Sequence, residues 1–203
     1  MSDLIIVGAG GHAKSALDVV EQESSFNVLG FVDNNLEKGT KVFSYEVLGK
    51  DDDLPELTSI SENVLIAVGQ IKDPDLRKKL YLKVKEIGFK LPNIISPKAY
   101  VSNDSEIGEG TIVMHGAIIN AGARIGTNCI INTGSIIEHD VEIGDNCHVS
   151  TGVTVNGSVK IGNETFIGSG SVLRNNISIG RRCLIGMGSN IINDLPDKTN
   201  YKR

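Results

Sequence analysis

Residues 125–143 read IGTNCIINTGSIIEHDVEI, and an aliphatic residue occupies every sixth position of this stretch. The same period runs from Val101 to Ile191 without a slip, and Ile-Gly pairs recur every eighteen residues within it. Because eighteen is three sixes, three short strands form one turn of a triangular prism, and one turn cannot bury its apolar face without its neighbours. The pattern predicts a parallel β-helix whose inward aliphatic side chains stack coil upon coil, with no long loop interrupting it.

The positions two residues before each inward aliphatic residue carry mostly small side chains, as a sharp corner of the prism requires. Cys129, Cys147 and Cys183 hold this position and are separated by eighteen or thirty-six residues. We expect them to be buried in one column, with Cys129 and Cys147 on adjacent coils. Their spacing matches no zinc motif, and we expect no disulfide.

Composition narrows the function. The 203 residues carry a net charge of -5 without a basic run, so nucleic acid is not an expected partner. No apolar run approaches twenty residues, so no transmembrane helix is expected. The N-terminus lacks a basic region and a cleavage site, which argues against a signal peptide and for a cytoplasmic protein.

The first part of the chain has the pattern of a Rossmann-like α/β domain. An apolar strand, Leu4 to Val7, meets the glycine turn 8–11, a helix follows to about Glu23, and a strand 28–32 ends at Asp33. Backbone N–H groups at a helix N-terminus form a phosphate site, and an acid at the end of the second strand can accept from a ribose or a base edge. The third glycine of the dinucleotide fingerprint is missing, which disfavours a dehydrogenase.

The rest of this domain is less regular. Residues 64–69 predict a third strand, 74–87 a helix and 89–95 a last strand, whereas 38–53 has no clear periodicity. About ninety residues suffice for a four-stranded mononucleotide-binding half. We therefore expect a nucleotide-sugar-binding domain over residues 1–95 and a β-helix over residues 96–203.

Histidines mark the candidate chemistry. His139 follows an inward isoleucine by two residues, so it should point outward near a corner, where Glu138 or Asp140 could fix its tautomer for general-base work. His148 follows His139 by nine residues, which is half a coil, so the two side chains face different ways within one prism. We expect them to approach each other only across a subunit boundary of a trimer. His115 faces elsewhere and is expected to be structural or solvent-exposed. The three histidines are not in equivalent coil positions, so we predict no metal site.

Five motifs carry a resemblance that spans nearly the whole chain: VGAGGH at 7–12, GFVD at 30–33, IAVG at 66–69, NTGSIIEHD at 132–140 and NCHVS at 146–150. The chain resembles the bacterial nucleotide-sugar and sialic-acid acetyltransferases of the left-handed β-helix superfamily. It looks most like the UDP-4-amino-sugar N-acetyltransferases of bacillosamine-type pathways. The resemblance implies left-handed coils, a homotrimer with active sites between subunits, and direct acetyl transfer from acetyl-CoA.

The resemblance also implies residue roles. His139 would be the catalytic base, Asp140 would orient it and Asn132 would support the site. His148 of a neighbouring subunit would contact the thioester carbonyl. Gly157, Gly168 and Gly186 would carry the pantetheine of acetyl-CoA. In the N-terminal domain, the nucleotide phosphates would meet Gly10, Gly11 and His12, and its base or ribose would meet Asp33.

Three functions remain open at this point. The first is N-acetylation of a UDP- or TDP-linked 4-amino sugar, and the second is O-acetylation of sialic acid. The third is a β-helix scaffold that binds a nucleotide sugar but transfers poorly. Relatives have a Gly-x-Pro-Ala turn after the position of Pro196, which covers the adenine of CoA. The turn is missing here, so weaker adenine contacts are expected.

Overall fold

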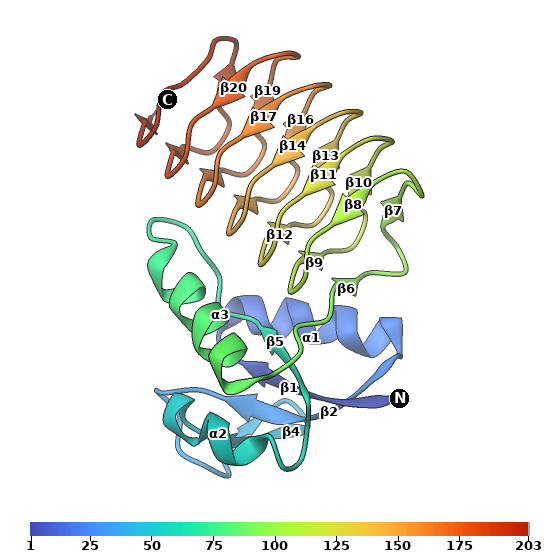
Figure 1. Cartoon of the computed structure of the whole chain (residues 1–203), viewed down its shortest axis with the longest axis vertical. Helices are drawn as coiled ribbons and strands as arrows, with labels where there is room; N and C mark the ends of the chain where they lie inside the picture. The colour runs from blue at the N-terminus through green and yellow to red at the C-terminus, as the bar shows by residue number, and fades with distance from the viewer. Residues whose placement is uncertain (203) are drawn as a thin grey trace.

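The computed structural model describes residues 1–202 and shows a prism of stacked strands seated on an α/β domain (Figure 1). The predicted fold class, an α/β N-terminal domain followed by a left-handed parallel β-helix, is confirmed. In the described part of the chain, no helix combines the length and the apolar character that crossing a membrane requires.

The N-terminal domain is built around a five-stranded sheet of order β3-β4-β2-β1-β5. Strands β1, β2, β4 and β5 are parallel, and β3 pairs antiparallel with β4. Apolar side chains of β1 and β5 are fully buried, as expected of parallel strands covered on both faces. The elements are β1 (Ser2–Val7), α1 (Gly11–Glu23), β2 (Phe26–Val32), β3 (Lys41–Val42), β4 (Tyr45–Gly49), the 3₁₀ helix η1 (Asp51–Asp53), α2 (Leu54–Leu57), β5 (Asn63–Ile66) and α3 (Asp75–Ile87).

Two details differ from the sequence-based expectation. The last strand predicted over 89–95 is wrong, because Lys90 makes only an isolated bridge to Asn63 and β6 (Ile94–Ile95) pairs with the β-helix. Pro92 lacks the N–H that a continuous ladder needs, so the segment leaves the sheet there. The unassigned segment 38–53 supplies the hairpin β3–β4, so the sheet has five strands rather than four. The domain boundary at residue 95 stays a prediction.

The prism consists of three parallel sheets, which we call sheets 1, 2 and 3. Every strand has two residues and pairs in register with the strand one coil away. Sheet 1 contains β6, β9 (Ile112–Val113), β12 (Ile130–Ile131), β15 (His148–Val149), β18 (Phe166–Ile167), β21 (Leu184–Ile185) and β23 (Asn200–Tyr201). Sheet 2 contains β7 (Tyr100–Val101), β10 (Ile118–Ile119), β13 (Ile136–Ile137), β16 (Thr154–Val155), β19 (Val172–Leu173) and β22 (Asn190–Ile191). Sheet 3 contains β8 (Glu106–Ile107), β11 (Arg124–Ile125), β14 (Glu142–Ile143), β17 (Lys160–Ile161) and β20 (Ser178–Ile179).

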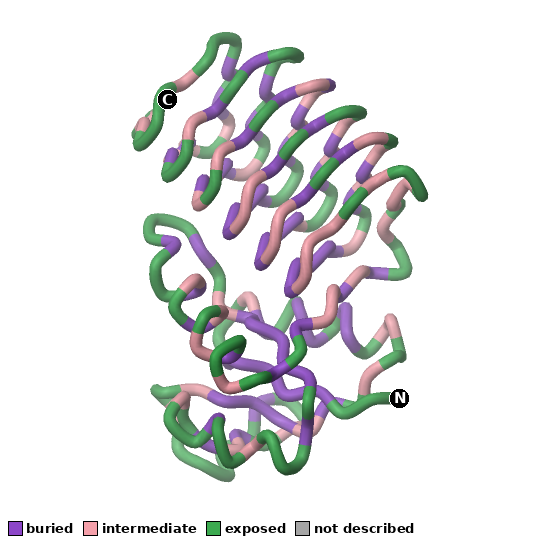
Figure 2. Tube along the Cα trace, in the orientation of Figure 1, coloured by how far each residue is buried: buried purple, intermediate pink, exposed green. Residues whose placement is uncertain are grey.

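The second residues of the short strands form one continuous buried cluster, and those at the two ends of the prism are partly buried against it. Figure 2 shows the buried positions recurring along the coils. The three cysteines are free and buried in this core. The Cys147 N–H donates to Cys129 Sγ over 3.4 Å, which places the two residues on adjacent coils as predicted.

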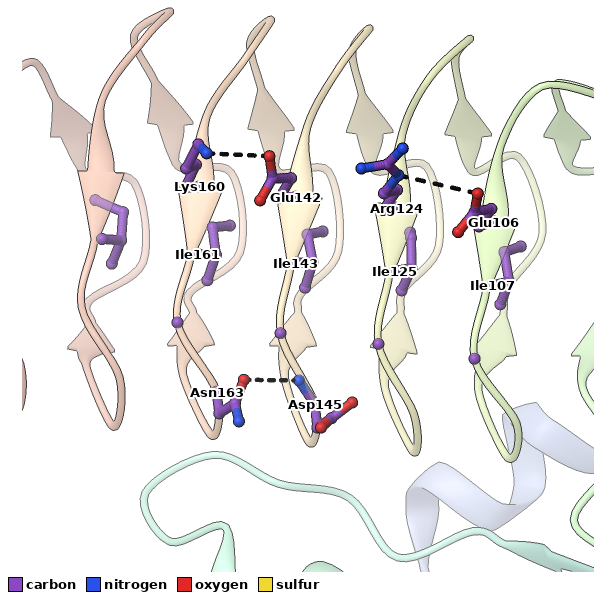
Figure 3. A pocket seen from close by; sticks show the side chains of 15 residues that line it. Glu106, Ile107, Arg124, Ile125, Glu142, Ile143, Asp145, Lys160, Ile161 and Asn163 are labelled. Atoms are coloured by element: carbon purple, nitrogen blue, oxygen red, sulfur yellow. Dashed lines mark hydrogen bonds and ion pairs between the residues drawn. The ribbon is translucent and has the colours of Figure 1, made fainter.

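The outward side chains of sheet 3 alternate in charge along the prism axis (Figure 3). Glu106 pairs with Arg124 at 3.9 Å, and Glu142 pairs with Lys160 at 3.1 Å. These charges satisfy one another across neighbouring strands and leave sheet 3 a polar, solvent-facing surface.

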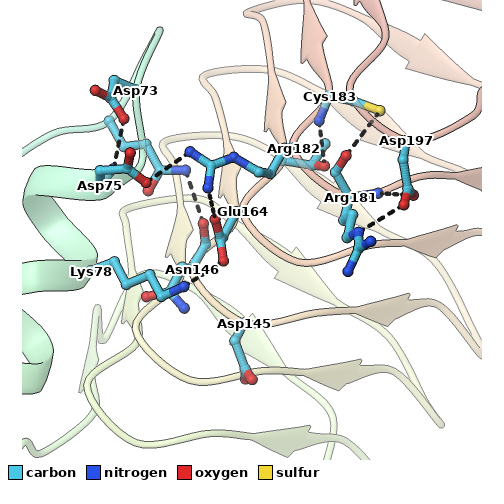
Figure 4. A network of polar contacts seen from close by, with 12 residues as sticks. Asp73, Asp75, Lys78, Asp145, Asn146, Glu164, Arg181, Arg182, Cys183 and Asp197 are labelled. Carbon is cyan, nitrogen blue, oxygen red and sulfur yellow. Dashed lines mark hydrogen bonds and ion pairs between the residues drawn. The ribbon is translucent and has the colours of Figure 1, made fainter.

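The N-terminal domain docks on sheet 1. Outward Ile94, Ile112 and Ile130 pack in one cluster with Ala13 and Ala16 of α1. Helix α3 and the loop before it lie along the corner between sheets 3 and 1. There Lys78 pairs with Glu164 at 2.8 Å, and Arg182 bridges Glu164 and Asp75 (Figure 4). Apolar and ionic contacts together fix the α/β domain to the side of the β-helix.

Candidate active site

His139 and Asp140 form a hydrogen-bonded pair at the corner between sheets 2 and 3. Strand β13 ends at Ile137, and the chain turns through Asp140, whose φ of 58° is left-handed. His139 Nδ1 lies 2.9 Å from Asp140 Oδ2, and both side chains are more than half exposed. An ionised carboxylate only accepts, so it holds the Nδ1–H tautomer and leaves the lone pair of Nε2 free to accept a proton. This is the arrangement of a general base.

The imidazole of His139 lies against Gly157 of the next coil. A Cβ atom built on Gly157 would approach His139 Cε1 and Nε2 to 2.6 Å, closer than real Cβ contacts allow. The backbone of Gly157 has no left-handed φ, so the glycine provides space rather than conformational freedom. Gly122 leaves similar room for the carboxylate, because a Cβ there would meet Asp140 Oδ1 at 2.6 Å. Glycines one coil away on either side therefore hold the pair in place.

His148 and Asn132 lie together on sheet 1, and the N-terminal domain covers His148. His148 is 6% exposed, donates from Nδ1 to the carbonyl of Gln70, and accepts at Nε2 from Asn132 Nδ2 over 3.1 Å. Burial, reinforced by the nearby Arg77 cation, lowers the pKa of His148 to about 4, although the bond to Gln70 acts in the opposite direction. His148 is therefore neutral at pH 7, with both ring nitrogens engaged.

One chain does not bring all the predicted catalytic residues together. His139 and Asp140 follow sheet 2, whereas Asn132 and His148 belong to the face of sheet 1. The roles predicted for Asn132 and His148 stay predictions, because they depend on a second copy of the chain.

The predicted pantetheine residues fall at two different corners. Gly157 lies beside His139, whereas Gly168 and Gly186 line an apolar hollow of about 310 Å³ between sheets 1 and 2. Its other walls include Phe166, Leu184, Met187 and Tyr201. A Cβ on Gly168 would meet the Met187 N atom at 2.5 Å, so only glycine permits this approach of the next coil.

The glycine turn of the N-terminal domain is open and preorganised. Gly10 and Gly11 are exposed at the N-terminus of α1, with no atom near the position of an added Cβ. Asp33 accepts from the N–H groups of Ala9 and Asn35, each over 2.8 Å, and so ties the turn to the end of β2. The free N–H groups of the first helical turn can bind phosphate.

The side chain of His12 points away from this open turn into the domain interface. Its ring centroid lies 6.5 Å from that of His148, and burial, aided by Arg77 and His148, lowers the pKa of His12 to about 3. A neutral imidazole in this place is poorly suited to bind phosphate, so His12 would contribute its backbone N–H.

Sequence reasoning missed Gln70 and Arg77. Arg77 is 1% exposed, and its guanidinium donates to the carbonyls of Ile66, Val68 and Asn128. Burial lowers its pKa only to about 10, so it remains a cation that links the end of β5 to the prism. Arg77 is the only arginine of α3, and it lies three and seven residues before Leu80 and Val84, so helical spacing places it on the buried face. This signal was available in the sequence.

The remaining histidine is structural. His115 bonds Ser96 Oγ at 2.6 Å and Asp18 Oδ2 at 2.7 Å, so it connects the first coil to α1, as expected of it. Among residues 1–202, no group of three or more His, Cys, Asp or Glu side chains is placed to hold a metal ion.

The sequence matches two families: the PglD N-terminal domain over residues 3–84, and the bacterial transferase hexapeptide (six repeats) over 104–138, 122–157 and 158–193. One similar solved structure is a histidine-to-asparagine variant of perosamine N-acetyltransferase from Caulobacter crescentus with CoA and GDP-perosamine. It has a TM-score of 0.90 and 34% identity over 97% of this chain and 91% of that chain. Another is the acetyltransferase domain of PglB from Neisseria gonorrhoeae FA1090 with acetyl coenzyme A. Its TM-score is 0.88, with 30% identity over 97% of this chain and 93% of that chain. No curated protein sequence matches the chain.

Proposed function

Because this chain belongs to the family of hexapeptide-repeat, left-handed β-helix N-acetyltransferases of nucleotide-linked amino sugars, we propose that it acetylates the 4-amino group of a sugar carried on UDP or TDP. The chain is an acetyl-CoA-dependent acetyltransferase. The observation that carries the proposal is the exposed His139–Asp140 pair over Gly157, because it leaves an accepting nitrogen where an amine can approach.

His139 acts as the general base in this proposal. Asp140 holds the Nδ1–H tautomer, so Nε2 can take a proton from the amine nitrogen that attacks the thioester carbon. Because the amine displaces the thiol of CoA directly, no covalent enzyme intermediate is needed. The buried Cys147 fits this view, since burial raises the pKa of its thiol well above the ordinary value and keeps it un-ionised.

The open surfaces of the chain offer a place for each substrate. The apolar hollow at Gly168 and Gly186 suits a pantetheine arm, while the glycine turn at Gly10 and Gly11 suits the diphosphate of a nucleotide sugar. Similarity to an enzyme solved with GDP-perosamine makes GDP a third carrier to test beside UDP and TDP. A cytoplasmic location stays a prediction.

The active site also requires a homotrimer in this proposal. The outward column of sheet 2 is mostly apolar, with Tyr100 59% exposed, Val172 40% exposed, and Ile118 and Ile136 between them. Sheet 3 is charged and sheet 1 is partly covered, so sheet 2 is the face suited to a second copy. Three copies packed through a heterologous contact of sheet 2 close into a ring. That contact would carry His139 towards sheet 1 of the neighbouring subunit, where the partly exposed Asn132 donates to the buried His148.

The first experiment measures CoA release from acetyl-CoA with UDP-, TDP- and GDP-linked 4-amino sugars and with sialic acid. We expect turnover of a nucleotide-linked amino sugar by the wild type, a loss of about 10²–10⁴-fold in His139→Ala, and a similar loss in Asp140→Asn. An asparagine could donate to Nδ1 and so place the proton on Nε2. Turnover of sialic acid alone would refute N-acetylation. Full activity in His139→Ala would refute the assigned base.

The trimer is tested separately by light scattering on wild type and on Ile136→Asp. We expect a trimer for the wild type and a monomer for the variant, with activity lost in parallel. Glu142→Gln, an exposed change on sheet 3, is the control and should remain trimeric. A monomeric wild type with full activity would contradict the shared active site.

A further inference from the structure

Glu138, which directly precedes the base, is a carboxylate without a cation. The prism contains five glutamates between residues 96 and 202. Four of them pair with lysine or arginine: Glu106, Glu109, Glu142 and Glu164. Within the described residues, Glu138 forms no ion pair. It is half-buried, and one of its oxygens accepts from Asn120 Nδ2 over 3.1 Å. An amide from the preceding coil thus orients this carboxylate and leaves its other oxygen free.

Asn156 presents a second free acceptor one coil further along. Glu138 and Asn156 are stacked in register, because Ile137 pairs with Val155 and the Glu138 N–H donates to the Val155 carbonyl over 2.9 Å. Asn156 Nδ2 is committed to the carbonyl of Leu173 over 2.6 Å. The amide therefore has a fixed orientation, and its Oδ1 accepts no hydrogen bond from within residues 1–202. The next residue, Gly157, lies under the His139 ring.

His139, Glu138 and Asn156 each have one atom that can accept a hydrogen bond. His139 offers Nε2 because Asp140 takes the proton-bearing Nδ1, Glu138 offers a carboxylate oxygen, and Asn156 offers an amide oxygen. A primary ammonium group has three N–H donors and no acceptor. Three acceptors match the three N–H donors of an ammonium, and the carboxylate matches its charge. A hydroxyl group could donate to only one of these acceptors.

We propose that Glu138 and Asn156 bind the substrate amine as its ammonium ion, beside His139, and so select amino sugars over hydroxy sugars. This assignment rests on the proposed N-acetyltransferase function and names the part of the site that recognises the amine.

The proton balance follows from this binding mode. One N–H of the ammonium gives its proton to His139 Nε2, and the nitrogen keeps the electron pair. That pair forms the C–N bond to the thioester carbon, the C–S bond breaks, and the sulfur takes a second proton from the nitrogen to leave as the CoA thiol. One proton passes from His139 to solvent for each amide formed. Glu138 stays ionised throughout, since it binds charge and transfers no proton.

The test compares Glu138→Gln with wild type on two ligands. One is the nucleotide-linked amino sugar that the wild type acetylates, and the other is the same nucleotide sugar with a hydroxyl group at that carbon. We expect KM and Kd for the amino sugar to rise about tenfold, since one charge-assisted hydrogen bond is worth roughly that factor. The Kd of the hydroxy sugar should change less than twofold. The defect should shrink at pH values where the free substrate amine is neutral.

Glu142→Gln is the matched control, because it removes a paired glutamate four residues away on sheet 3 and should change neither ligand's binding. Equal thermal midpoints of the variants exclude unfolding as a cause. If Glu138→Gln binds both ligands like the wild type, or weakens both equally, the ammonium assignment is wrong and the acetyltransferase function stands. A wild type that acetylates none of the amino sugars overturns the proposed function and this assignment with it.

Discussion

At the scale of single residues, the position of His139, the proposed base, depends on Gly157 having no side chain. His139 and Gly157 belong to successive coils, and the eighteen-residue register places them against each other. Asp140 on one side and the bare backbone of Gly157 on the other restrict the imidazole to one orientation. A catalytic group held in this way needs little reorganisation before it accepts a proton.

This arrangement predicts the effect of Gly157→Ala. The added methyl group would lie 2.6 Å from two ring atoms, so the exposed imidazole must rotate away from it. We expect kcat to fall about 10²-fold, because a misplaced base loses most of a typical general-base contribution. The thermal midpoint should change by a few degrees at most, since the displaced ring is on the surface. Steady-state kinetics and a melting curve measure the two effects. An unchanged kcat would show that catalysis does not depend on the position of the His139 ring against Gly157.

At the scale of the element, each strand of the prism divides its two residues between core and solvent. In β17, Ile161 is buried in the stacked core, whereas Lys160 points outward to pair with Glu142. The same division recurs at every sixth residue, so the core is a set of aliphatic columns and each column is only as stable as its contacts between coils.

Two substitutions in β17 separate these roles. Ile161→Ala should lower the free energy of unfolding by about 2–4 kcal/mol, because it leaves a cavity between the neighbouring isoleucines. Lys160→Ala should cost less than about 1 kcal/mol, because its ion pair is exposed. Urea unfolding of both variants measures the difference. Equal losses of unfolding free energy in the two variants would show that the inward aliphatic column is not the main source of the prism's stability.

At the scale of the whole molecule, a buried and positively charged interface joins the two domains. Arg77 is charged and fully enclosed, and His12 and His148 share its surroundings. Two carboxylates at this side, Glu164 and Asp75, are already paired with Lys78 and Arg182. Protonating either histidine would add a positive charge beside Arg77 without a partner, which is costly in a buried site.

The interface therefore predicts acid sensitivity. Burial lowers the pKa of His148 from 6.5 to about 4 and that of His12 to about 3. The unfolded chain thus binds more protons than the folded chain below pH 6.5. Stability should be fully present above that pH and fall as the pH drops towards 4. Urea unfolding between pH 4.5 and 7.5 should show this slope, and His148→Asn, which can still donate to Gln70, should reduce it. An identical slope in the variant would remove His148 from the explanation.

The sequence by itself determined the β-helix, the helices α1 and α3, and the identity of His139 as the outward histidine of its coil. These follow from local rules, because a six-residue period decides which side chain points inward whatever lies outside the prism. The local pattern did not distinguish Asp140 from Glu138 as the partner of the imidazole, since both flank it in the chain, and only the family resemblance pointed to Asp140.

Only the tertiary structure decided how the two domains meet. It showed that residues 94–95 join the prism, that His12 turns away from the glycine turn, and that Gln70 and Arg77 support the interface. The pairing of Ile94–Ile95 with Ile112–Val113 follows the eighteen-residue period of the coils. The contacts of Gln70 and Arg77, by contrast, join residues separated by about fifty to eighty positions, where no periodicity exists. Their formation depends on the fit of one folded surface against another, and a single sequence does not encode that fit in any repeating pattern.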